Sequence, residues 1–428
     1  MDAPDAIEAE LRAQAPRVLG TLMRRHGQLD RCEDAVQEAL LAAYRSWRHV
    51  PERPFGWLLT VAERRLVDEH RRDAARTRRE ERAAREAPVT AVAEPDEGDP
   101  GDDDTLTLLL LCCHPDLAPP SQIALTLRAV GGLTTAQVGR LLLSSEQTVG
   151  QRIVRAKARL RGVPFGMPPA LERGPRLDAV LQVLYLMFTE GHVASVGPEL
   201  QRDDLAAEAI RLTRALRVAL PDDANVEGLL ALMLLTHARR ASRVSDGELV
   251  PLAEQDRSLW DLAMIAEGVS LVERALGRKP LGRYPLQAAI AAIHAEAADG
   301  EATDWPQILA LFDLLRRLDD NPVVELNRAV AVGQVEGGRR GLTALDGLAR
   351  DPRVGSDHRL DAVRGHLLAL VGDYAAAAQA YARAARRAPA LPERRYLARR
   401  AAELRQDSTA ASAPPRSSST SAARPATR

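Results

Sequence analysis

The stretch LTTAQVGRLLLSSEQTVGQRIVRAKARL, residues 133–160, decides the fold of its part of the chain. Its first part predicts a helix from about Thr135 to Leu142, because apolar residues recur there at helical spacing. Ser144 follows, three residues before Gln147, which is the spacing of a capping box at the start of a new helix. The buried side of that second helix is predicted from apolar residues three and four positions apart, namely Val149, Ile153 and Ala156.

The opposite side of the second helix is polar and basic. It carries Gln147, Thr148, Gln151, Arg152, Arg155 and Arg159. Amide side chains can hydrogen-bond adenine, guanidinium groups can bind guanine or phosphate, and Gly150 lets the backbone approach a duplex. Between Arg140 and Arg161 the only acid is Glu146. The pattern favours a recognition helix in a major groove over a helical hairpin with a solvated arginine face.

The composition predicts an all-α protein. Of the 428 residues 46% are hydrophobic and only 3% aromatic, and alanine, leucine and arginine, all strong helix formers, dominate. The net charge of −1 argues against a protein that coats nucleic acid indiscriminately. An odd number of cysteines (Cys32, Cys112 and Cys113) fits a reducing compartment. We expect no metal and no cofactor, since Cys112-Cys113-His114 lacks the two-residue gap of common zinc knuckles.

The amino-terminal segment does not resemble a secretory signal. Residues 1–10 are acidic and lack an apolar core, and no uncharged apolar run reaches the roughly 20 residues that span a bilayer. We therefore expect a soluble, cytoplasmic protein without a membrane partner.

Proline, glycine and charge divide the chain into blocks. Residues 87–104 are rich in Pro, Gly, Asp and Glu, the composition of a flexible acidic linker, and GVPFGMPP at 162–169 cannot continue a helix. The predicted parts are a first helical block at 6–86, the linker at 87–104, a second block at 105–162, a helical extension at 170–405 and a disordered tail at 406–428. In the extension, the spacing of Pro and Gly breaks suits antiparallel helix pairs rather than strands.

The first block contains two predicted amphipathic helices. DAVQEALLAAYRSW, residues 34–47, precedes the loop His49 to Pro54 and then RPFGWLLTVAERRLVDEHRR, residues 53–72. The predicted core residues of the second helix are Trp57, Leu58, Val61, Leu66 and Val67, and its exposed basic residues are Arg64, Arg65, Arg71 and Arg72. In isolation these features predict only a helical bundle with a charged surface.

Together the two blocks resemble a known family. Residues 34–47 resemble the helix of sigma region 2 that docks on the clamp helices of RNA polymerase, and residues 54–72 resemble the segment that recognises and melts the −10 element. Residues 131–161 resemble sigma region 4, which reads the −35 element. The order of the blocks, the acidic linker and the absence of a region 3 domain are similar to extracytoplasmic-function sigma factors of the sigma-70 family.

The resemblance implies partners and site residues. Core RNA polymerase and promoter DNA would be the partners, and the loop His49 to Pro54 would hold a flipped −10 base. Polymerase would be contacted by Asp34, Gln37 and Glu38. The −10 region would be contacted by Arg64, Arg65, Arg71 and Arg72, whose cations suit a melted strand. The −35 duplex would be contacted by Gln147, Thr148, Gln151, Arg152 and Arg155.

The extension resembles that of a sigma-factor subgroup with a long helical carboxyl-terminal part. The similar segments are RLDAVLQVLYLMFTEGHVAS (176–195) and LAEQDRSLWDLAMIAEG (252–268). HLLALVGDYAAAAQAYARAARRAP (366–389) resembles a tetratricopeptide repeat, which we place near 361–394, and 322–348 resembles a degenerate second copy. One repeat cannot bury its own apolar face, so neighbouring helices must complete a short superhelix.

Two acidic motifs in the extension could suggest catalysis. They are Glu190-Gly191-His192 and Asp256-Arg257-Ser258, the latter followed by Trp260-Asp261. No nucleophile elbow, metal pair or phosphate loop accompanies them, so we expect capping and salt-bridge roles. His237 and His294 lie in apolar helical sequence and are predicted core residues.

Three hypotheses follow from these patterns. The leading one is a sigma factor that binds core polymerase and directs transcription initiation, with an extension that regulates it and offers a surface for a regulatory protein or ligand. The alternative is a helix-turn-helix transcriptional regulator with a helical-repeat sensing domain. The third, an enzyme with its site in residues 170–405, is disfavoured, and we predict that the protein is not an enzyme.

Overall fold

The prediction of an all-α protein is confirmed. The computed structural model describes residues 3–81, 104–142, 144–192, 203–351, 353–355 and 357–411, and within these ranges it contains eighteen α-helices and one two-stranded sheet. The predicted acidic linker, apart from Asp104, lies outside the described residues. The chain divides into two compact units, one of residues 1–240 with 261–288 and the other of residues 241–260 with 289–428.

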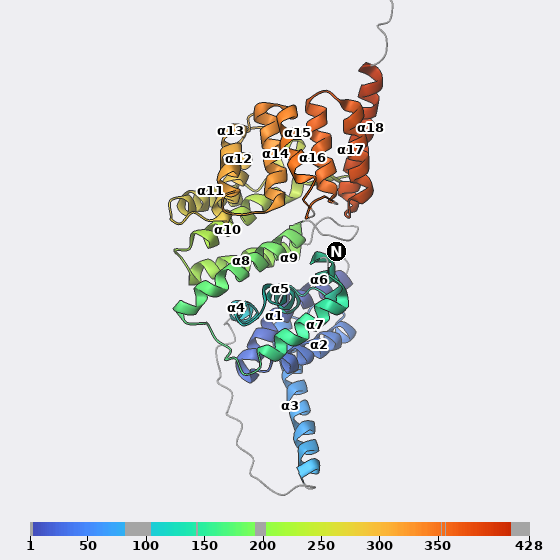
Figure 1. Cartoon of the computed structure of the whole chain (residues 1–428). Coiled ribbons are helices and arrows are strands. Elements are labelled where there is room, and N and C mark those ends of the chain that lie inside the picture. The colour runs from blue at the N-terminus through green and yellow to red at the C-terminus, as the bar shows by residue number, and fades with distance from the viewer. Residues whose placement is uncertain are drawn as a thin grey trace, which may run out of the picture. The chain divides into compact units, whose positions relative to one another are not determined.

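The first unit begins with three packed helices, α1 (Ala3–His26), α2 (Leu29–Ser46) and α3 (Pro54–Glu81) (Figure 1). Gly27, at φ +70°, makes the sharp turn between α1 and α2, a conformation that glycine adopts without strain. Leu22, Leu58 and Leu66 are fully buried between the three helices. The prediction that Val67 is a core residue is wrong. Its side chain is 42% exposed, because it lies on a different side of α3 from the buried Leu66.

Four further helices form the predicted helix-turn-helix block: α4 (Thr105–Cys112), α5 (Pro119–Ala129), α6 (Thr135–Leu141) and α7 (Glu146–Arg159). The turn between α6 and α7 is tight at Gly139, where a Cβ would lie 2.8 Å from the carbonyl oxygen of Ser144. The predicted N-cap of α7 is wrong by one residue, since Ser145 accepts the backbone N–H of Thr148. The capping box lies one helix earlier, between Thr134 and Gln137.

The remaining helices of the first unit belong to the extension: α8 (Ala170–His192), α9 (Asp203–Ala219), α10 (Ala224–His237), α11 (Leu262–Leu276) and the first part of α12 (Arg283–Glu296). Helix α10 is mainly apolar and almost wholly buried, as expected of a central helix. Its Gly228 lets Pro285 approach so closely that a Cβ would lie 2.4 Å from the proline nitrogen. Helix α8 packs against α5 and α9.

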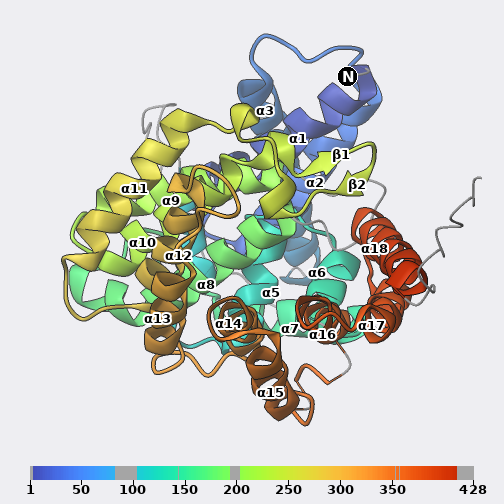
Figure 2. The same ribbon diagram turned by 90° about the horizontal axis from the view of Figure 1, so that it is seen from above.

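The second unit contains the helical repeats. Its helices are the end of α12, α13 (Trp305–Leu315), α14 (Pro322–Glu336), α15 (Gly338–Leu348), α16 (His358–Leu370), α17 (Tyr374–Arg387) and α18 (Leu391–Ala411), and neighbours along the chain from α13 to α18 pack together (Figures 1 and 2). Gly372 and the N-cap Asp373 form the turn between α16 and α17, within the segment that resembles a tetratricopeptide repeat. The predicted tail boundary at residue 406 lies inside α18, which continues to Ala411; residues 412–428 are outside the described part.

A β-hairpin was not predicted. It pairs β1 (Val244–Ser245) with β2 (Glu248–Leu249). Both strands lie in residues 241–260, which connect α10 to α11 in the sequence but belong to the second unit. Asp246 and Gly247 make its turn, with φ +51° and +74°, which is the pattern of a two-residue type I′ connection. Three short 3-10 helices flank it, at Arg240–Ser242, Leu252–Glu254 and Arg257–Leu259. None of the helices in the described ranges is both long and apolar enough to cross a membrane.

Candidate nucleic-acid and polymerase interfaces

Helix α7 carries the predicted −35 residues on its exposed side. Gln147, Thr148, Gln151 and Arg155 are exposed, whereas the apolar side of the helix is buried. Arg152 is half-buried and donates from Nη1 to the Ser144 hydroxyl at 3.4 Å, so part of it is turned toward the start of the helix. Four of the five side chains are thus presented together, with amide and guanidinium groups that can hydrogen-bond base edges.

The carboxyl-terminal end of α7 is engaged by α2 through ion pairs that we did not predict. Lys157 Nζ lies 2.6 Å from Glu33 Oε2 and 3.7 Å from Asp30 Oδ1, and Arg161 Nη2 lies 3.2 Å from Asp30 Oδ2. Arg128 of α5 adds a third cation, with Nε 3.6 Å from Glu33 Oε1.

Glu33 is the centre of this network. The residue is only 8% exposed, and a buried carboxylate is costly unless cations compensate it. Glu33 Oε2 has no well-aligned hydrogen bond, so its short contact with Lys157 is best described as an ion pair. A charged residue on the apolar side of α2, between Cys32 and Ala35, was the one signal in the sequence that could have revealed it.

The predicted polymerase-binding residues share an exposed side of α2. Asp34, Gln37 and Glu38 are exposed there, together with Leu41 and Tyr44, which are 54% and 60% exposed. Such large apolar side chains beside carboxylates suit a protein partner. Partial burial raises the pKa of Asp34 and outweighs the effect of the nearby Lys157, which lowers it.

The predicted −10 residues follow one another along α3. Arg64, Arg65 and Arg71 are exposed, and Arg65 Nε lies 3.2 Å from Glu38 Oε2. Arg72 lies in α3, but its side chain is outside the described part of the chain. In the preceding loop, His49, Glu52 and Arg53 are exposed, and Trp47 packs edge-on against Trp57 at its base, with ring centroids 5.3 Å apart.

The extension packs against both predicted promoter-binding blocks. Arg176 of α8 is 6% exposed and donates from Nη1 to the carbonyl of Leu110 in α4 at 3.2 Å. Asp204 of α9 pairs with Arg12 of α1 at 3.6 Å. These contacts make α8 and α9 part of the packing that surrounds α1 and α4, not an appended domain.

The acidic motifs of the extension have structural roles. Asp256 caps the 3-10 helix Arg257–Leu259 by accepting from Ser258, and this bonding lowers its pKa. Arg257 donates to the carbonyls of His294 and Ala297 at 3.0 and 2.7 Å, and Trp260 donates to Ser242 at 2.8 Å.

The motif on α8 is buried. Glu190 and His192 are 8% and 7% exposed, and the ring of His192 stacks on Phe188 at 5.3 Å. His237 is buried against the edge of Phe188, and burial lowers its pKa, whereas His294 is half-buried against Trp305.

The adjacent cysteines are packed inside the helix-turn-helix block. Cys113 Sγ lies 3.7 Å from Thr126 Oγ1, and burial raises the pKa of its thiol to about 12. Burial also raises the pKa of Cys112 and takes that of Cys32 to about 11. Across the described ranges no three His, Cys, Asp or Glu side chains lie together as metal ligands would.

Comparison with known proteins agrees with these arrangements. Residues 11–77 match the family model of Sigma-70 region 2, residues 107–160 that of Sigma-70, region 4, and residues 176–276 that of a family of unknown function (DUF6596). Uncharacterized protein R00370 of Rhizobium meliloti (strain 1021) is 39% identical over 399 residues, which are 91% of this chain and 94% of the relative. No solved structure matches.

The two sigma-70 regions define a transcription factor that acts in promoter recognition, by binding core RNA polymerase and promoter DNA. The chain belongs to the sigma-70 family, as a sigma factor of the extracytoplasmic-function type with a carboxyl-terminal extension.

Proposed function

We propose that this sigma factor directs transcription initiation from a closed state in which its extension holds regions 2 and 4 together. In this proposal the −35 element is read by Gln147, Thr148, Gln151, Arg152 and Arg155, the −10 region is bound by Arg64, Arg65, Arg71 and Arg72, and polymerase is contacted by Asp34, Gln37 and Glu38. The protein works in the cytoplasm, where polymerase is.

The network around Glu33 is the observation that carries the closed state. Lys157 and Arg161 lie where the end of a recognition helix would follow DNA phosphates. Here they are bound instead by the carboxylates of Glu33 and Asp30. The two carboxylates therefore occupy cations that promoter phosphates would otherwise neutralise.

Promoter geometry makes this state incompatible with binding both elements. The −10 and −35 elements are separated by roughly 25 base pairs, on the order of 80 Å along a B-form duplex. Regions 2 and 4 cannot span that length while Lys157 remains 2.6 Å from Glu33. Opening of the contact must precede or accompany engagement of the whole promoter.

The extension supports a regulatory role because it touches both modules. Arg176 anchors α8 to α4, and Asp204 anchors α9 to α1. Any signal that displaces α8 and α9 would weaken the closed state. Glu190 and His192 are buried in α8 and Asp256 caps a short 3-10 helix, so we expect their charge-neutral substitution to abolish no chemical activity.

The exposed side of α7 favours one alternative, a helix-turn-helix regulator that binds duplex DNA without polymerase. A pull-down of full-length protein with core polymerase separates the two functions. Retention of core enzyme, lost with Glu38→Arg, supports the sigma factor. Tight duplex binding with no retention supports the regulator.

The closed state is tested by Glu33→Gln, with Asp116→Asn, an exposed carboxylate paired with His114, as the matched control. We expect Glu33→Gln to raise −35 duplex binding by the free protein about threefold to tenfold, because Lys157 is released. Asp116→Asn should leave binding unchanged. Equal binding by wild type and Glu33→Gln would refute the closed state without touching the sigma assignment, which transcription with core enzyme tests separately.

A further inference from the structure

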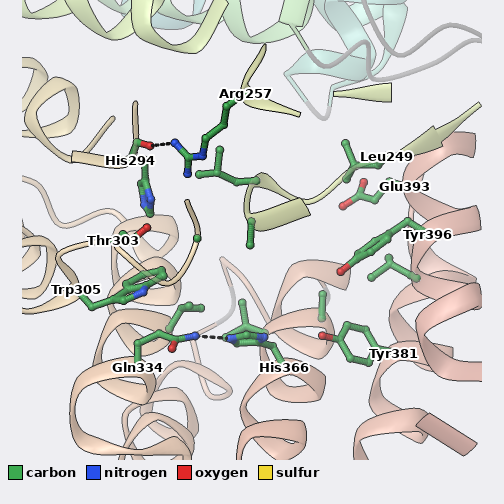
Figure 3. Close-up of a pocket in the computed structure, with 17 residues that line it drawn as sticks. Leu249, Arg257, His294, Thr303, Trp305, Gln334, His366, Tyr381, Glu393 and Tyr396 are labelled. Atoms are coloured by element: carbon green, nitrogen blue, oxygen red, sulfur yellow. Dashed lines mark hydrogen bonds between the residues drawn. The ribbon is translucent and has the colours of Figure 1, made fainter. Parts of the chain in front are cut away.

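A cavity of about 420 Å³ lies in the second unit, lined by segments that are distant in sequence (Figure 3). Part of the lining comes from the hairpin segment, through Leu249 and Leu252, and part from the helical repeats, through Tyr381 and Tyr396. Its size is in the range of pockets that hold a small organic molecule.

The hairpin is fixed over the cavity by contacts with α18. Arg399 Nε lies 3.0 Å from Glu248 Oε2, and Arg395 donates to the carbonyl of Gly247 at 3.4 Å. The side chain of Arg395 also fills the space beside Gly247, where a Cβ would lie 2.9 Å away. The hairpin therefore covers one side of the repeats and forms part of the wall of a partly open pocket.

The lining is mainly aromatic and aliphatic. Rings of Trp305, Tyr381 and Tyr396 line it together with Val330, Val363 and Leu397. Flat ring faces and branched aliphatic groups favour a planar, apolar body over a flexible polar one.

A few neutral polar groups converge on the same space, as Figure 3 shows for Gln334 and His366. The Gln334 amide lies 3.2 Å from His366 Nε2, and burial, aided by Arg400, lowers the pKa of His366. The imidazole is therefore neutral at neutral pH and accepts from the amide N–H. Burial raises the pKa of Tyr381 and Tyr396, so both hydroxyls stay protonated and can donate.

The charged residues of the lining are already bound within the protein. Arg257 donates to two main-chain carbonyls and lies over Trp260, with its guanidinium carbon 4.4 Å from the ring centroid. Glu393 Oε1 lies 3.0 Å from His358 Nε2. Each charge has a partner, so the lining does not call for an anion or a cation.

We propose that this cavity binds one small neutral organic ligand with a flat aromatic or unsaturated body and a hydrogen-bonding edge. The edge would meet Gln334 and the two tyrosine hydroxyls, and the flat body would lie among the rings. The hairpin segment continues along the chain into α10 at one end and α11 at the other, so occupancy is placed to influence the part of the extension that belongs to the first unit. That coupling rests on the proposed function, whereas binding itself does not.

The test uses the full-length protein and N-phenyl-1-naphthylamine, a neutral aromatic probe that fluoresces in apolar sites. We expect saturable binding of one probe per chain. Its sulfonated analogue, 1-anilinonaphthalene-8-sulfonate, should bind about tenfold more weakly, because Arg257, the arginine of the lining, is already bound to main-chain carbonyls. Equal affinity for the two probes, or several probes per chain, would overturn the proposal.

Two variants fill the cavity from opposite walls. Val363→Trp enters from α16, and Ala253→Trp enters from the exposed 3-10 segment, where it disturbs no buried core. Each should weaken probe binding at least about tenfold. Leu370→Trp, on an exposed position of α16 outside the lining, is the matched control and should change it less than about twofold.

Thermal melting establishes whether each variant folds. If Val363→Trp does not fold, Ala253→Trp alone tests the site. Unchanged probe affinity in a folded filling variant would show that the probe binds elsewhere and would refute the site. Because no polymerase or DNA is present, this result says nothing for or against the closed state of regions 2 and 4.

Discussion

Two charged clusters, one in each unit, are built from different chemistry. In the first unit, Lys157, Arg161 and Arg128 surround Glu33 and Asp30. In the second, His358 lies between Asp357 and Glu393, with nitrogen–oxygen distances of 3.1 and 3.0 Å. Lysine and arginine stay charged throughout the physiological pH range, whereas histidine does not.

The difference teaches what each cluster can respond to. Permanent charges are insensitive to mild pH change but compete with phosphates and with salt, which suits a contact between DNA-binding modules. The histidine cluster ties α16 to α18 within one unit and responds to protons. Four predictions test this contrast, from the largest expected effect to the smallest.

The largest effect is a pH dependence in the second unit. Burial alone lowers the pKa of His358, but its bonds to Asp357 and Glu393 outweigh this and raise it to about 9. A raised pKa means that the stabilisation is complete below the unfolded value, about 6.5, and is lost as pH rises through about 9. The effect is on the order of 3 kcal/mol.

Amide hydrogen exchange of α16 and α18 in the full chain measures it. Protection should fall between pH 6.5 and 9.5 after correction for intrinsic exchange, and His358→Gln should be less protected at pH 6 and flat across this window. A wild-type profile that matches His358→Gln would show that the histidine is not charged in the folded state.

The second effect is a coupling between Glu33 and Lys157. A double-mutant cycle of Glu33→Gln and Lys157→Gln in urea unfolding should give about 1 to 2 kcal/mol, because the pair is largely buried. The exposed pair Arg65–Glu38 is the control and should give no more than about 0.5 kcal/mol. Equal coupling in the two pairs would remove the special role of Glu33.

The third effect concerns Arg155, which lies on the exposed side of α7 and forms none of the ion pairs of this network. Arg155→Ala should weaken binding of the holoenzyme to its promoter duplex about tenfold, through loss of a guanidinium contact to a base. Arg140→Ala on α6 serves as the comparison. Anisotropy titrations at several salt concentrations give both affinities, and the assignment fails if Arg140→Ala costs more than Arg155→Ala.

The smallest effect is at Gly150. A Cβ there would meet only Thr135 Cγ2 at 3.9 Å, so Gly150→Ala should stabilise the free helix by about 0.5 to 1 kcal/mol. If the bare backbone is needed against DNA, the same variant loses promoter affinity while its unfolding midpoint rises. A gain in both quantities would show that the glycine has no role in DNA contact.

Features with local causes were predictable from the sequence. The helix-turn-helix and the repeat turn at Gly372-Asp373 follow from apolar spacing and from residues that begin or end helices. Ser144 fitted the capping-box spacing with Gln147, but Ser145 is the N-cap, and the carbonyl of Ser144 packs closely against Gly139 instead. The hairpin strands are two residues long, too short for periodicity, although Asp246-Gly247 was a usable signal.

Long-range contacts were not predictable. The Glu33 network joins residues distant in sequence, and its existence depends on how regions 2 and 4 pack in three dimensions. The cavity in the second unit likewise needs the hairpin, α16 and α18 to meet. Sequence patterns gave the exposed side of α7, but they could not tell that its carboxyl-terminal end is occupied by acids from α2.

The chain offers a direct measurement of the closed state, because it has only two lysines. Lys157 has a side chain 14% exposed and is paired with Glu33, whereas Lys279 is exposed and serves as an internal control. Brief acetylation followed by mass spectrometry gives the ratio of the two labelling rates. If regions 2 and 4 are locked together, Lys157 in the free protein is labelled far more slowly than Lys279, and both Glu33→Gln and binding of core polymerase speed it up. Equal labelling of the two lysines in the free protein would contradict the account.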